Sequence, residues 1–384
     1  MRIGIDVFSL DKPGGNYGVG VGVYAWNILP ELIKQGKNHQ FIIFANSDNK
    51  ELIPIGENCR TIVSPFSNRL RLLRVLHEQL WLPLQCLKNK LDFVHLFGIN
   101  GSFLLFRRSI ITVYDLMWKY YYDRGSREPK FLYYRIVVPP TIRKTEGIIT
   151  ISQFIASEIK DKFHRVDNVY PVCLGPGDFN DYGAEDAAGF GQKYSYEYIY
   201  TVTTSMPHKN LKVLLEAFVK IRQTQKSGLK LVITGQLKGN FHKETETFRN
   251  SHSLRDDIIL TGFISEKEKT YCYRSASVFV FPSLYEGFGL PILEAMKLGV
   301  PVIAADVASL PEVGGDACIY FNPNSSDELF EKITFLLGSV EKRKEMIERG
   351  KTQSDKFSWE KTANETLQIY QKVFELNMRL TTEN

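Results

Sequence analysis

The sequence predicts an α/β protein with two domains, each built on a doubly wound parallel sheet. Three observations support this prediction. A chain of 384 residues is long enough for two domains that each bury a core of their own. Short apolar, β-branched runs alternate with helical stretches in both halves, as they do when helices join parallel strands. Hydrophobic periodicity lapses over residues 175–191, where glycine, proline and acidic residues dominate, and such a stretch is typical of a linker.

Composition indicates a cytoplasmic globular protein. The chain is 43% hydrophobic and 24% charged, proportions that are typical of soluble domains. No run of apolar residues approaches the roughly eighteen that a membrane-spanning helix needs. Because a strand-like run begins at Ile3, we expect no signal peptide. The five cysteines are scattered without the spacing of metal ligands or redox pairs, so we expect reduced core thiols.

Positive charge is concentrated in the N-terminal half. Residues 1–180 carry 23 Lys and Arg against 16 Asp and Glu, a net charge of +7, whereas residues 181–384 carry 25 against 27, a net charge of −2. Residues 60–144 alone carry 15 against 5. This excess points to an anionic partner, such as a lipid phosphate or the inner surface of the membrane. An ordinary solvated surface explains it equally well. No nucleic-acid-binding module is apparent, so nucleic acid is not an expected partner.

The N-terminal half begins with a strand and a glycine-rich loop. The loop starts at Gly14 and leads into an amphipathic helix that ends near Gly36. Its glycines lack the spacing of the dinucleotide-binding fingerprint, so a plain tight turn stays open as an explanation. His95 ends one of the strand-like runs, and we expect it to be a core histidine with satisfied hydrogen bonds. The strand-like runs of this half cover residues 3–8, 41–45, 61–64, 93–97, 110–114, 147–151 and 169–172.

A helix rich in leucine and arginine is predicted over residues 69–88. Leucines recur at helical spacing among arginines, a pattern typical of helices that lie on a membrane surface. Packing against the core explains the same leucines, and Pro83 interrupts the pattern, so we favour the core. The leucines are Leu70, Leu73, Leu76, Leu80 and Leu84. Further along, the aromatic residues of 118–135 predict a partly buried cluster, with stacking on a sugar or contact with a lipid interface as the lesser alternatives.

The C-terminal half predicts a second sheet and a final helix. Ser358 is a good N-cap for a helix that runs from Glu360 to about Leu376. No internal repeat is apparent. The strand-like runs of this half cover residues 198–203, 230–234, 258–260, 278–281, 300–304 and 317–320.

The stretch from Glu286 to Glu294 carries the clearest functional signal. It follows a buried strand-like run, and its two glycines allow a tight turn in which the backbone can approach a ligand. Pro291 suits the first turn of a helix, and the positive end of that helix favours an anion. We place Glu294 in the first helical turn, leaning back toward the ligand. A phosphate of the ligand would lie on the loop and the helix start, and the two carboxylates would accept hydrogen bonds from hydroxyl groups on either side of it. A nucleotide sugar, which has phosphates between two polyols, fits this arrangement.

The run Phe-Pro-Ser-Leu-Tyr-Glu-Gly-Phe-Gly-Leu-Pro-Ile-Leu-Glu-Ala-Met, residues 281–296, resembles the donor-site signature of the family 4 retaining glycosyltransferases. The resemblance continues through residues 299–303 and 309–317 and is looser in the N-terminal half. That family has the GT-B fold, in which two Rossmann-like doubly wound domains face a central cleft. The resemblance therefore implies an acceptor-binding domain over residues 1–175, a nucleotide-sugar-binding domain over residues 176–356, and a last helix over residues 357–384 that crosses back to the first domain.

The resemblance also implies which residues form the site. The family has a lysine that holds the donor diphosphate, matched by Lys209, and an accompanying arginine, replaced here by Thr203 or His208. Related enzymes commonly have His-Asp where this chain has Tyr114 and Asp115, and a phenol is a poor base at neutral pH. The predicted catalytic residues are Glu286, Lys209, Tyr114 and Asp115, and the predicted donor-binding residues are Gly20, Gly22, Thr203, His208, Lys209, Gly287, Phe288, Gly289, Leu290 and Glu294.

The function that these residues predict is transfer of a hexose, of mannose or glucose type, from a nucleoside diphosphate sugar to an acceptor hydroxyl. The resemblance implies retention of configuration, a GDP- or UDP-sugar donor, and a glycan or lipid-linked acceptor in cell-surface polysaccharide synthesis. No Asp-x-Asp metal motif stands out, so we expect protein groups rather than a metal ion to stabilise the diphosphate. A phosphorylase or sugar-nucleotide epimerase, and a catalytically silent sugar-nucleotide-binding subunit of a glycan-assembly complex, are the alternatives.

Overall fold

The structure is a computed structural model of the chain. It describes residues 1–10, 19–98, 101–102, 104–105, 108–121, 135–177, 179, 183–224 and 228–382. The start of the predicted glycine-rich loop, much of the aromatic segment and part of the predicted linker lie outside these residues. The chain divides into two compact units, which we describe separately. Unit 1 comprises residues 1–175 and 357–384, and unit 2 comprises residues 176–356.

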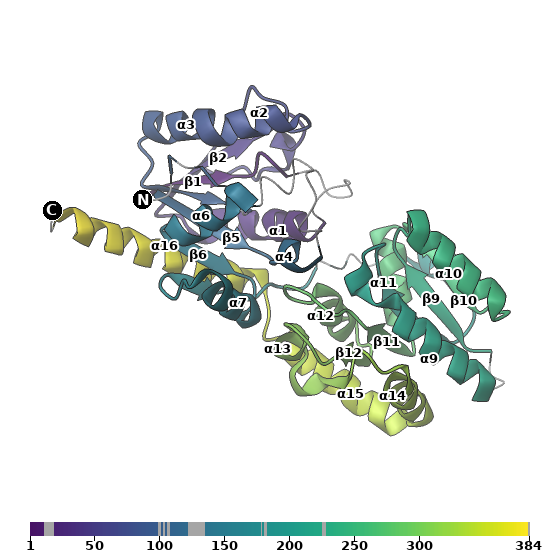
Figure 1. The fold of residues 1–384 in the computed structure, drawn as a ribbon. Helices are drawn as coiled ribbons and strands as arrows, with labels where there is room; N and C mark the ends of the chain where they lie inside the picture. The colour runs from purple at the N-terminus through teal and green to yellow at the C-terminus, as the bar shows by residue number, and fades with distance from the viewer. Residues whose placement is uncertain are drawn as a thin grey trace. The chain divides into compact units, whose positions relative to one another are not determined.

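Unit 1 contains a parallel sheet of seven strands in the order β3-β2-β1-β4-β5-β6-β7 (Figure 1). The order reverses between β1 and β4, so the switch point of the sheet lies between these two strands. Open α/β sheets bind their ligands outside the carboxyl ends of the strands at such a point. The strands are β1 (Arg2–Asp6), β2 (Gln40–Ala45), β3 (Cys59–Val63), β4 (Phe93–Leu96), β5 (Ser109–Val113), β6 (Gly147–Thr150) and β7 (Val169–Pro171).

The last helix, α16 (Trp359–Thr382), packs along α1 (Val19–Gln35) in unit 1 (Figure 1). Its Tyr370 is fully buried and contacts the rings of Phe93 and His95. The other described helical segments of unit 1 are η1 (Lys50–Leu52), α2 (Arg71–Leu76), the π-helical turn η2 (His77–Trp81), α3 (Leu82–Lys88), α4 (Trp118–Tyr121), α6 (Val138–Lys144) and α7 (Gln153–Phe163).

The prediction that the leucines of residues 69–88 pack in the core is largely wrong. Leu70, Leu80 and Leu84 are each more than half exposed, whereas Leu73 and Leu76 are half-buried. Leucine alone does not say which face of a helix meets the core. In this segment that face is formed by buried His77 and Leu82 and by half-buried Trp81. Pro83 does not break the helix, because the chain stays helical from α2 through the π-helical turn η2 into α3.

Unit 2 contains a second parallel sheet, with six strands in the order β10-β9-β8-β11-β12-β13 (Figure 1). Its order reverses between β8 and β11. The strands are β8 (Tyr198–Val202), β9 (Lys230–Thr234), β10 (Ile258–Gly262), β11 (Val278–Phe281), β12 (Val302–Ala305) and β13 (Cys318–Phe321). The helical segments are α8 (Ala184–Lys193), η4 (Pro207–Lys209), α9 (Leu211–Thr224), α10 (Gly239–Ser251), α11 (Glu266–Arg274), α12 (Leu290–Lys297), α13 (Leu310–Gly314), η5 (Gly315–Ala317), α14 (Ser326–Gly338) and α15 (Val340–Ser354).

The prediction of two doubly wound α/β sheets is confirmed. Strands that are apolar along their whole length, such as β11 and β12, are buried at every position, as parallel strands covered on both faces must be. Among the described residues, no helix has both the length and the apolar character that crossing a bilayer requires.

Candidate functional site

The predicted loop and helix at the carboxyl end of β11 form as the sequence indicates, with one shift. Helix α12 begins at Leu290, after Gly289, whose φ of +113° is one that other residues rarely adopt. A Cβ on Gly289 would also lie 2.9 Å from Leu310 Cδ2. Because the helix starts one residue earlier than predicted, Glu294 is its fifth residue. Glu294 therefore lies in the second turn rather than the first.

Ser309, which the sequence did not single out, holds this loop in place. Its side chain is fully buried, and its Oγ lies 2.9 Å from the carbonyl oxygen of Glu286 and 2.7 Å from that of Phe288. The preceding residue, Ala308, has a φ of +55°, a strained value for a residue with a Cβ. The serine belongs to the run 309–317 noted above, but only the structure shows what its hydroxyl contacts.

The structure brings Lys209 and Glu286 together. Lys209 ends the short η4 turn that follows β8, and Asn210 then takes a left-handed conformation before α9. The Lys209 Nζ donates to Glu286 Oε1 over 2.6 Å, and it lies 5.4 Å from the centre of the Phe281 ring. The side chains of Lys209 and Glu286 are 18% and 15% exposed. Sequence analysis assigned the two residues to different parts of a ligand and did not predict that they pair.

His208 and Thr203 line the same edge of the sheet, but they add no second cation. Burial lowers the pKa of His208 to about 4, with the carboxylate of Glu286 opposing that shift and Lys209 adding to it. At neutral pH the imidazole is therefore uncharged. The backbone of His208 accepts a hydrogen bond from the Leu284 N–H over 2.7 Å, which joins the two loops. Thr203 is buried, and its carbonyl packs so closely on Gly235 that a Cβ there would lie 1.8 Å away.

Glu294 is held by groups of unit 2. Its Oε2 accepts from the Tyr273 hydroxyl over 3.0 Å, and Lys269 Nζ lies 3.8 Å from its Oε1. Burial raises the pKa of Glu294, and the positive charge of Lys269 opposes that shift. The carboxylate keeps further acceptor capacity, because each of its oxygens can accept two hydrogen bonds.

Two predicted loop glycines of unit 1 lie in a helix instead. Gly20 and Gly22 are in the first turns of α1. A Cβ on Gly20 would meet none of the described atoms within 4 Å, and one on Gly22 would only touch Trp26 at 3.8 Å. The predicted loop position was wrong for both, because helical structure begins at Val19. Their predicted contact with donor phosphates stays a prediction.

Tyr114 and Asp115 follow β5 at the carboxyl edge of the unit 1 sheet. Tyr114 is buried, its ring meets the Tyr24 ring edge-on at 5.3 Å, and burial raises the pKa of its phenol well above 10. Asp115 Oδ1 accepts from the Met117 N–H over 2.9 Å. His95 is the core histidine that was predicted, because its ring nitrogens lie 2.6 Å from the Tyr370 hydroxyl and 2.8 Å from Thr112 Oγ1.

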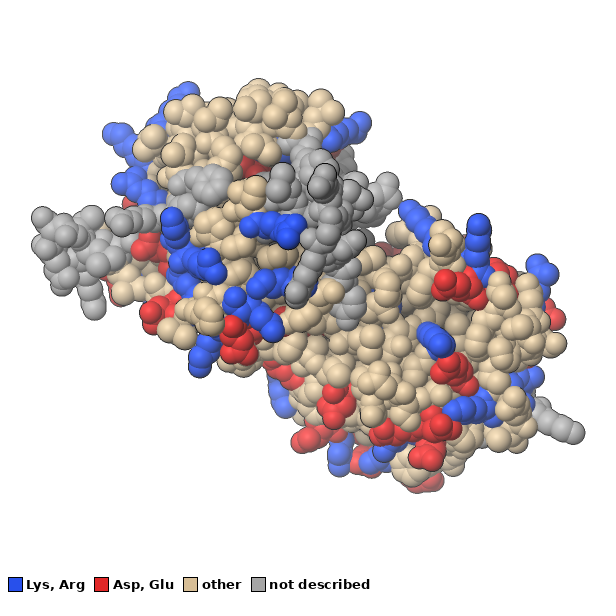
Figure 2. Space-filling view, in the orientation of Figure 1, with Lys and Arg blue, Asp and Glu red and all other residues tan. Residues whose placement is uncertain are grey.

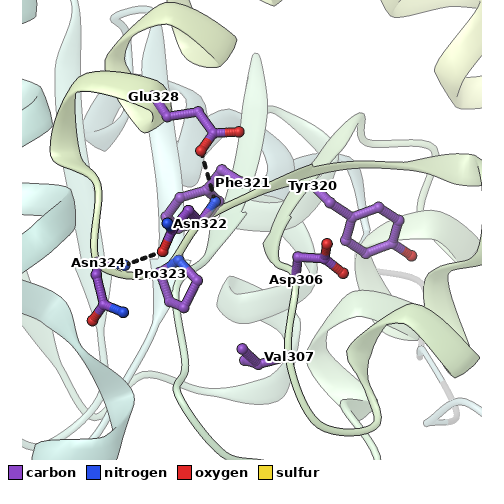
Figure 3. A pocket seen from close by; sticks show the side chains of 8 residues that line it. All are labelled: Asp306, Val307, Tyr320, Phe321, Asn322, Pro323, Asn324 and Glu328. Carbon is purple, nitrogen blue, oxygen red and sulfur yellow. Dashed lines mark hydrogen bonds between the residues drawn. The ribbon is translucent and has the colours of Figure 1, made fainter.

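A polar cavity of about 430 Å³ lies at the carboxyl ends of β12 and β13, beside rather than at the Lys209–Glu286 pair (Figure 3). Two hydrogen bonds lie within its lining: Glu328 Oε2 accepts from the Asn322 N–H, and Asn322 Oδ1 accepts from the Asn324 N–H. Asn210 donates to the carbonyl of Pro323, which links the cavity wall to the Lys209 turn. In the part of the chain that the structure describes, no group of three or more His, Cys, Asp and Glu is arranged to hold a metal ion.

Comparison with known proteins defines the class. The model of the group 1 glycosyl transferases matches residues 185–353, and that of glycosyltransferase family 4 matches residues 19–172. The O-antigen chain mannosyltransferase B of Escherichia coli is 28% identical over 91% of this chain and 95% of its own length. The serotype-specific mannosyltransferase WbdA of Escherichia coli is 26% identical over 70% of this chain, and the match spans 34% of that protein.

Solved structures agree on the fold. Sucrose-phosphate synthase from Thermosynechococcus elongatus superposes with a TM-score of 0.76 at 18% identity, over 98% of this chain and 99% of its own. Anabaena HepE, solved with UDP and glucose, superposes with a TM-score of 0.72 at 16% identity, over 99% of this chain and 100% of its own. The protein is thus a two-domain enzyme of the Rossmann-like GT-B class. Within that class, the chain belongs to the group 1 glycosyltransferases of family 4.

Proposed function

We propose that this glycosyltransferase moves a hexose, of mannose or glucose type, from a GDP- or UDP-sugar to a hydroxyl of a glycan or lipid-linked acceptor in cell-surface polysaccharide synthesis. The observation that carries the proposal is the Lys209–Glu286 pair at the mouth of a tight turn that opens into α12. Both named relatives are mannosyltransferases, and one of them is an O-antigen chain mannosyltransferase, which favours mannose and a polysaccharide product.

The pair suggests how the donor binds. A diphosphate that enters beside Lys209 competes with Glu286 for the ammonium group, since its two phosphates together carry more negative charge than one carboxylate. Once the diphosphate has displaced Glu286 from Lys209, the carboxylate of Glu286 is free to accept hydrogen bonds from sugar hydroxyls, for which it is well suited. The positive end of α12, at residues 289–290, adds a fixed partial charge to that of Lys209. Glu294, held by Tyr273, is the proposed acceptor for ribose hydroxyls.

The same groups lower the barrier to transfer. Cleavage of the anomeric C–O bond leaves an extra negative charge on the departing diphosphate, and Lys209 and the start of α12 are already in place to stabilise it. This charge comes from the protein, so we propose that the reaction needs no divalent ion.

We further propose that configuration is retained and that the departing phosphate takes the proton of the acceptor hydroxyl. The raised pKa of Tyr114 supports this route, because a phenol that stays protonated at neutral pH donates hydrogen bonds but does not act as a base.

A donor panel tests the proposal. Purified protein is incubated in EDTA with GDP-mannose, UDP-glucose and related sugars, with methyl α-D-mannopyranoside as acceptor, and released nucleotide is quantified. We expect release with one donor, an α-linked product by NMR, and loss of both in Lys209→Ala. Lys212→Ala is the matched control, because Lys212 is exposed and pairs only loosely with Glu216 at 3.7 Å. Binding without any release would instead indicate a catalytically silent subunit, and activity that requires magnesium would contradict the mechanism.

A surface of unit 1 supports a proposed contact with an anionic membrane. Leu72, Leu80, Leu84 and Leu87, which we call the leucine stripe, are each more than half exposed along α2, η2 and α3. Residues 60–90 contain six Lys and Arg and one acid, Glu78, which is buried. Figure 2 shows the surface over α2 and α3 as mostly uncharged, with basic side chains at both ends. Exposed leucines framed by cations fit a bilayer surface that carries acidic lipids.

Vesicle flotation tests this contact. We expect the protein to float with phosphatidylglycerol vesicles, to float less at high salt, and to stay in solution with phosphatidylcholine. Leu80→Glu with Leu84→Glu removes flotation, and Phe335→Glu, at an exposed apolar residue of unit 2, is the control. Equal flotation of the double variant and the control would contradict the proposed surface.

A further inference from the structure

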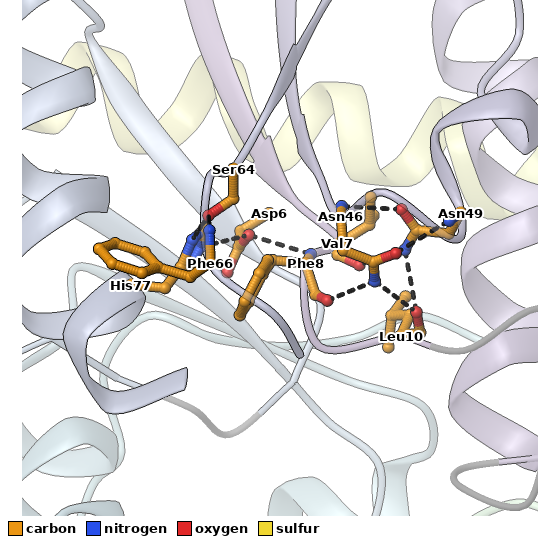
Figure 4. A network of polar contacts seen from close by, with 9 residues as sticks. All are labelled: Asp6, Val7, Phe8, Leu10, Asn46, Asn49, Ser64, Phe66 and His77. Atoms are coloured by element: carbon orange, nitrogen blue, oxygen red, sulfur yellow. Dashed lines mark hydrogen bonds and ion pairs between the residues drawn. The ribbon is translucent and has the colours of Figure 1, made fainter. Parts of the chain in front are cut away.

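The carboxyl edge of the unit 1 sheet contains a buried polar network that the proposed donor site does not use (Figure 4). Polar side chains follow three adjacent strands: Asp6 ends β1, Asn46 follows β2 and Ser64 follows β3. His77 joins them from the π-helical turn that covers this edge. All four are buried. Single π-helical turns inside α-helices occur frequently at functional sites.

Two members of this network, Asn46 and Asn49, make side-chain hydrogen bonds to backbone groups. Asn46 Nδ2 donates to the carbonyls of Phe8 and Leu10, and Asn49 Nδ2 donates to those of Val7 and Leu10. Asn46 Oδ1 accepts from the Asn49 N–H, and Asn49 Oδ1 accepts from the Asn46 N–H (Figure 4). The two amides are therefore fully occupied. Their effect is to fix the chain just after Asp6.

His77 is held from several sides. Its ring stacks on Phe8 at 3.7 Å with an interplanar angle of 10°, and it stacks on Trp81 at 5.0 Å. Its Nδ1 lies 3.0 Å from Ser64 Oγ, and its Nε2 lies 3.2 Å from Asp6 Oδ1. Ser64 Oγ also accepts from the Phe66 N–H over 3.3 Å. The imidazole is fully buried and has one orientation that satisfies these contacts.

The directions of these hydrogen bonds follow from the chemistry of the groups. An ionised carboxylate only accepts, so His77 must donate its Nε2–H to Asp6. In a neutral imidazole, Nδ1 then accepts from the Ser64 hydroxyl, whose oxygen in turn receives the Phe66 N–H. Ser64 thereby fixes the tautomer of His77, and His77 fixes the rotation of the Asp6 carboxylate.

One oxygen of Asp6 is left open. Oδ1 accepts both from His77 and from the Phe8 N–H, the latter over 3.2 Å. Among the described residues, Oδ2 has no hydrogen-bond partner, although the side chain is only 8% exposed. A largely buried carboxylate is stabilised when its oxygens accept hydrogen bonds. It lies on β1, which borders the switch point of the sheet, the place where sheets of this kind bind ligands.

We propose that the open oxygen of Asp6 binds a hydroxyl group of the acceptor sugar, and that His77 is the positioning residue that orients the carboxylate. A carboxylate oxygen takes hydrogen-bond donors only, so a sugar hydroxyl fits and a phosphate does not. The inference rests on the proposed function, because it assumes a sugar acceptor. It assigns to unit 1 a contact that selects the acceptor, separate from the donor contacts of unit 2.

Asp6→Asn is the sharpest test. The amide oxygen can still accept from Phe8 and His77, while the amide nitrogen turns the open acceptor into a donor. With methyl α-D-mannopyranoside as acceptor and the donor that wild type uses, we expect kcat/KM for the acceptor to fall about 10- to 100-fold, mainly through KM. The donor KM and hydrolysis of the donor without acceptor stay within about twofold. His77→Gln weakens acceptor use in the same direction by about 3- to 10-fold.

Asp92→Asn is the matched control. Asp92 lies at the opposite, amino edge of the same sheet, where its carboxylate accepts from the Arg2 N–H, so acceptor kinetics should not change. An acceptor KM equal to that of wild type in Asp6→Asn would overturn the inference. So would an equal loss of donor hydrolysis, since that would show a structural role. Either result leaves the proposed function standing if wild type transfers sugar.

A binding measurement covers the case in which wild type transfers nothing and the proposed function fails. Saturation-transfer NMR of methyl α-D-mannopyranoside should show contact with wild type and Asp92→Asn but not with Asp6→Asn. No contact with wild type, or equal contact with wild type and Asp6→Asn, would contradict the inference. Thermal melting of each variant checks that the fold is intact.

Discussion

The carboxyl edges of the two sheets hold buried charge in different ways. In unit 2, Lys209 and Glu286 pair with each other, and both keep some exposure. In unit 1, Asp6 is clamped by a backbone N–H and by a histidine that is itself fixed by Ser64. In unit 2, Lys209 can exchange Glu286 for a charged ligand. In unit 1, Asp6 can only present one carboxylate oxygen in a fixed orientation.

This difference matches what the two proposed ligands require. A donor diphosphate brings more negative charge than Glu286 and can displace it from Lys209, so a self-paired site stays neutral until the donor arrives. An acceptor hydroxyl is neutral and displaces nothing, so its partner must be oriented in advance. The predictions below are ways to test this contrast, and they run from the largest expected effect to the smallest.

Glu286→Ala should separate transfer from nucleotide binding. Without Glu286, Lys209 loses its ion-pair partner and is free to bind the diphosphate. The hydroxyls of the donor sugar, however, lose the carboxylate that accepts their hydrogen bonds. We expect kcat to fall about 100- to 1,000-fold, which corresponds to about 3–4 kcal/mol, while GDP or UDP binds at least as tightly as to wild type. Kinetics and calorimetry measure the two effects. Weaker nucleotide binding in this variant would mean that the pair does not exchange partners.

Gly235→Ala should destabilise unit 2. The new Cβ would lie 1.8 Å from the Thr203 carbonyl oxygen, and the glycine has a φ of +125°. We expect a loss of about 3 kcal/mol or more in the free energy of unfolding, since strain and steric overlap add. Gly22→Ala is the contrast from unit 1, because it adds a methyl group at a helical position with room for it. The free energy of unfolding of that variant should rise by up to about 1 kcal/mol. Denaturant titration measures both variants, and equal changes in their free energies of unfolding would contradict this prediction.

Stability should fall as the pH drops below about 6.5. Burial lowers the pKa of His95 to about 3 and that of His208 to about 4, so the unfolded chain binds protons that the folded chain refuses. The stability that each neutral histidine provides is complete above pH 6.5 and is lost progressively toward pH 4 for His208 and pH 3 for His95. Thermal melting from pH 7 to pH 5 should drop more steeply for wild type than for His95→Gln. Parallel curves would argue against a neutral, buried His95.

Ala308→Gly should give the smallest effect, a gain of about 0.5–1 kcal/mol. A φ of +55° strains alanine but not glycine, and the greater freedom of glycine in the unfolded chain offsets part of the relief. Because Ser309 must still reach the 286–288 loop, activity should not change. A lower melting temperature would show that Ala308 is not strained.

The sheets and the unit 2 loop were predictable because their signals are local. The apolar runs that became β8 to β13 and the Gly289–Pro291 turn each specify their own backbone. Side-chain partners were harder to predict. Lys209 and Glu286 are far apart in sequence, and their pairing depends on β8 and β11 being neighbours, which no local pattern encodes.

The unit 1 network was not predictable for the same reason. Asp6, Ser64 and His77 come from three separate segments, and each alone is an ordinary residue at the end of a strand or within a helix. The exposed leucines of α2 and α3 escaped prediction because periodicity shows that a helix has an apolar face but not what that face meets. The helical start of α1 at Val19 escaped because glycines favour a loop.

Calorimetric titration of GDP and UDP into the protein in EDTA tests the central claim most directly, namely that the protein itself supplies the positive charge that holds the donor diphosphate. We predict that wild type and Lys212→Ala bind the preferred nucleotide without metal, and that Lys209→Ala binds it about 10- to 100-fold more weakly. Equal affinity of Lys209→Ala and wild type, or binding that appears only when magnesium is added, would contradict the account.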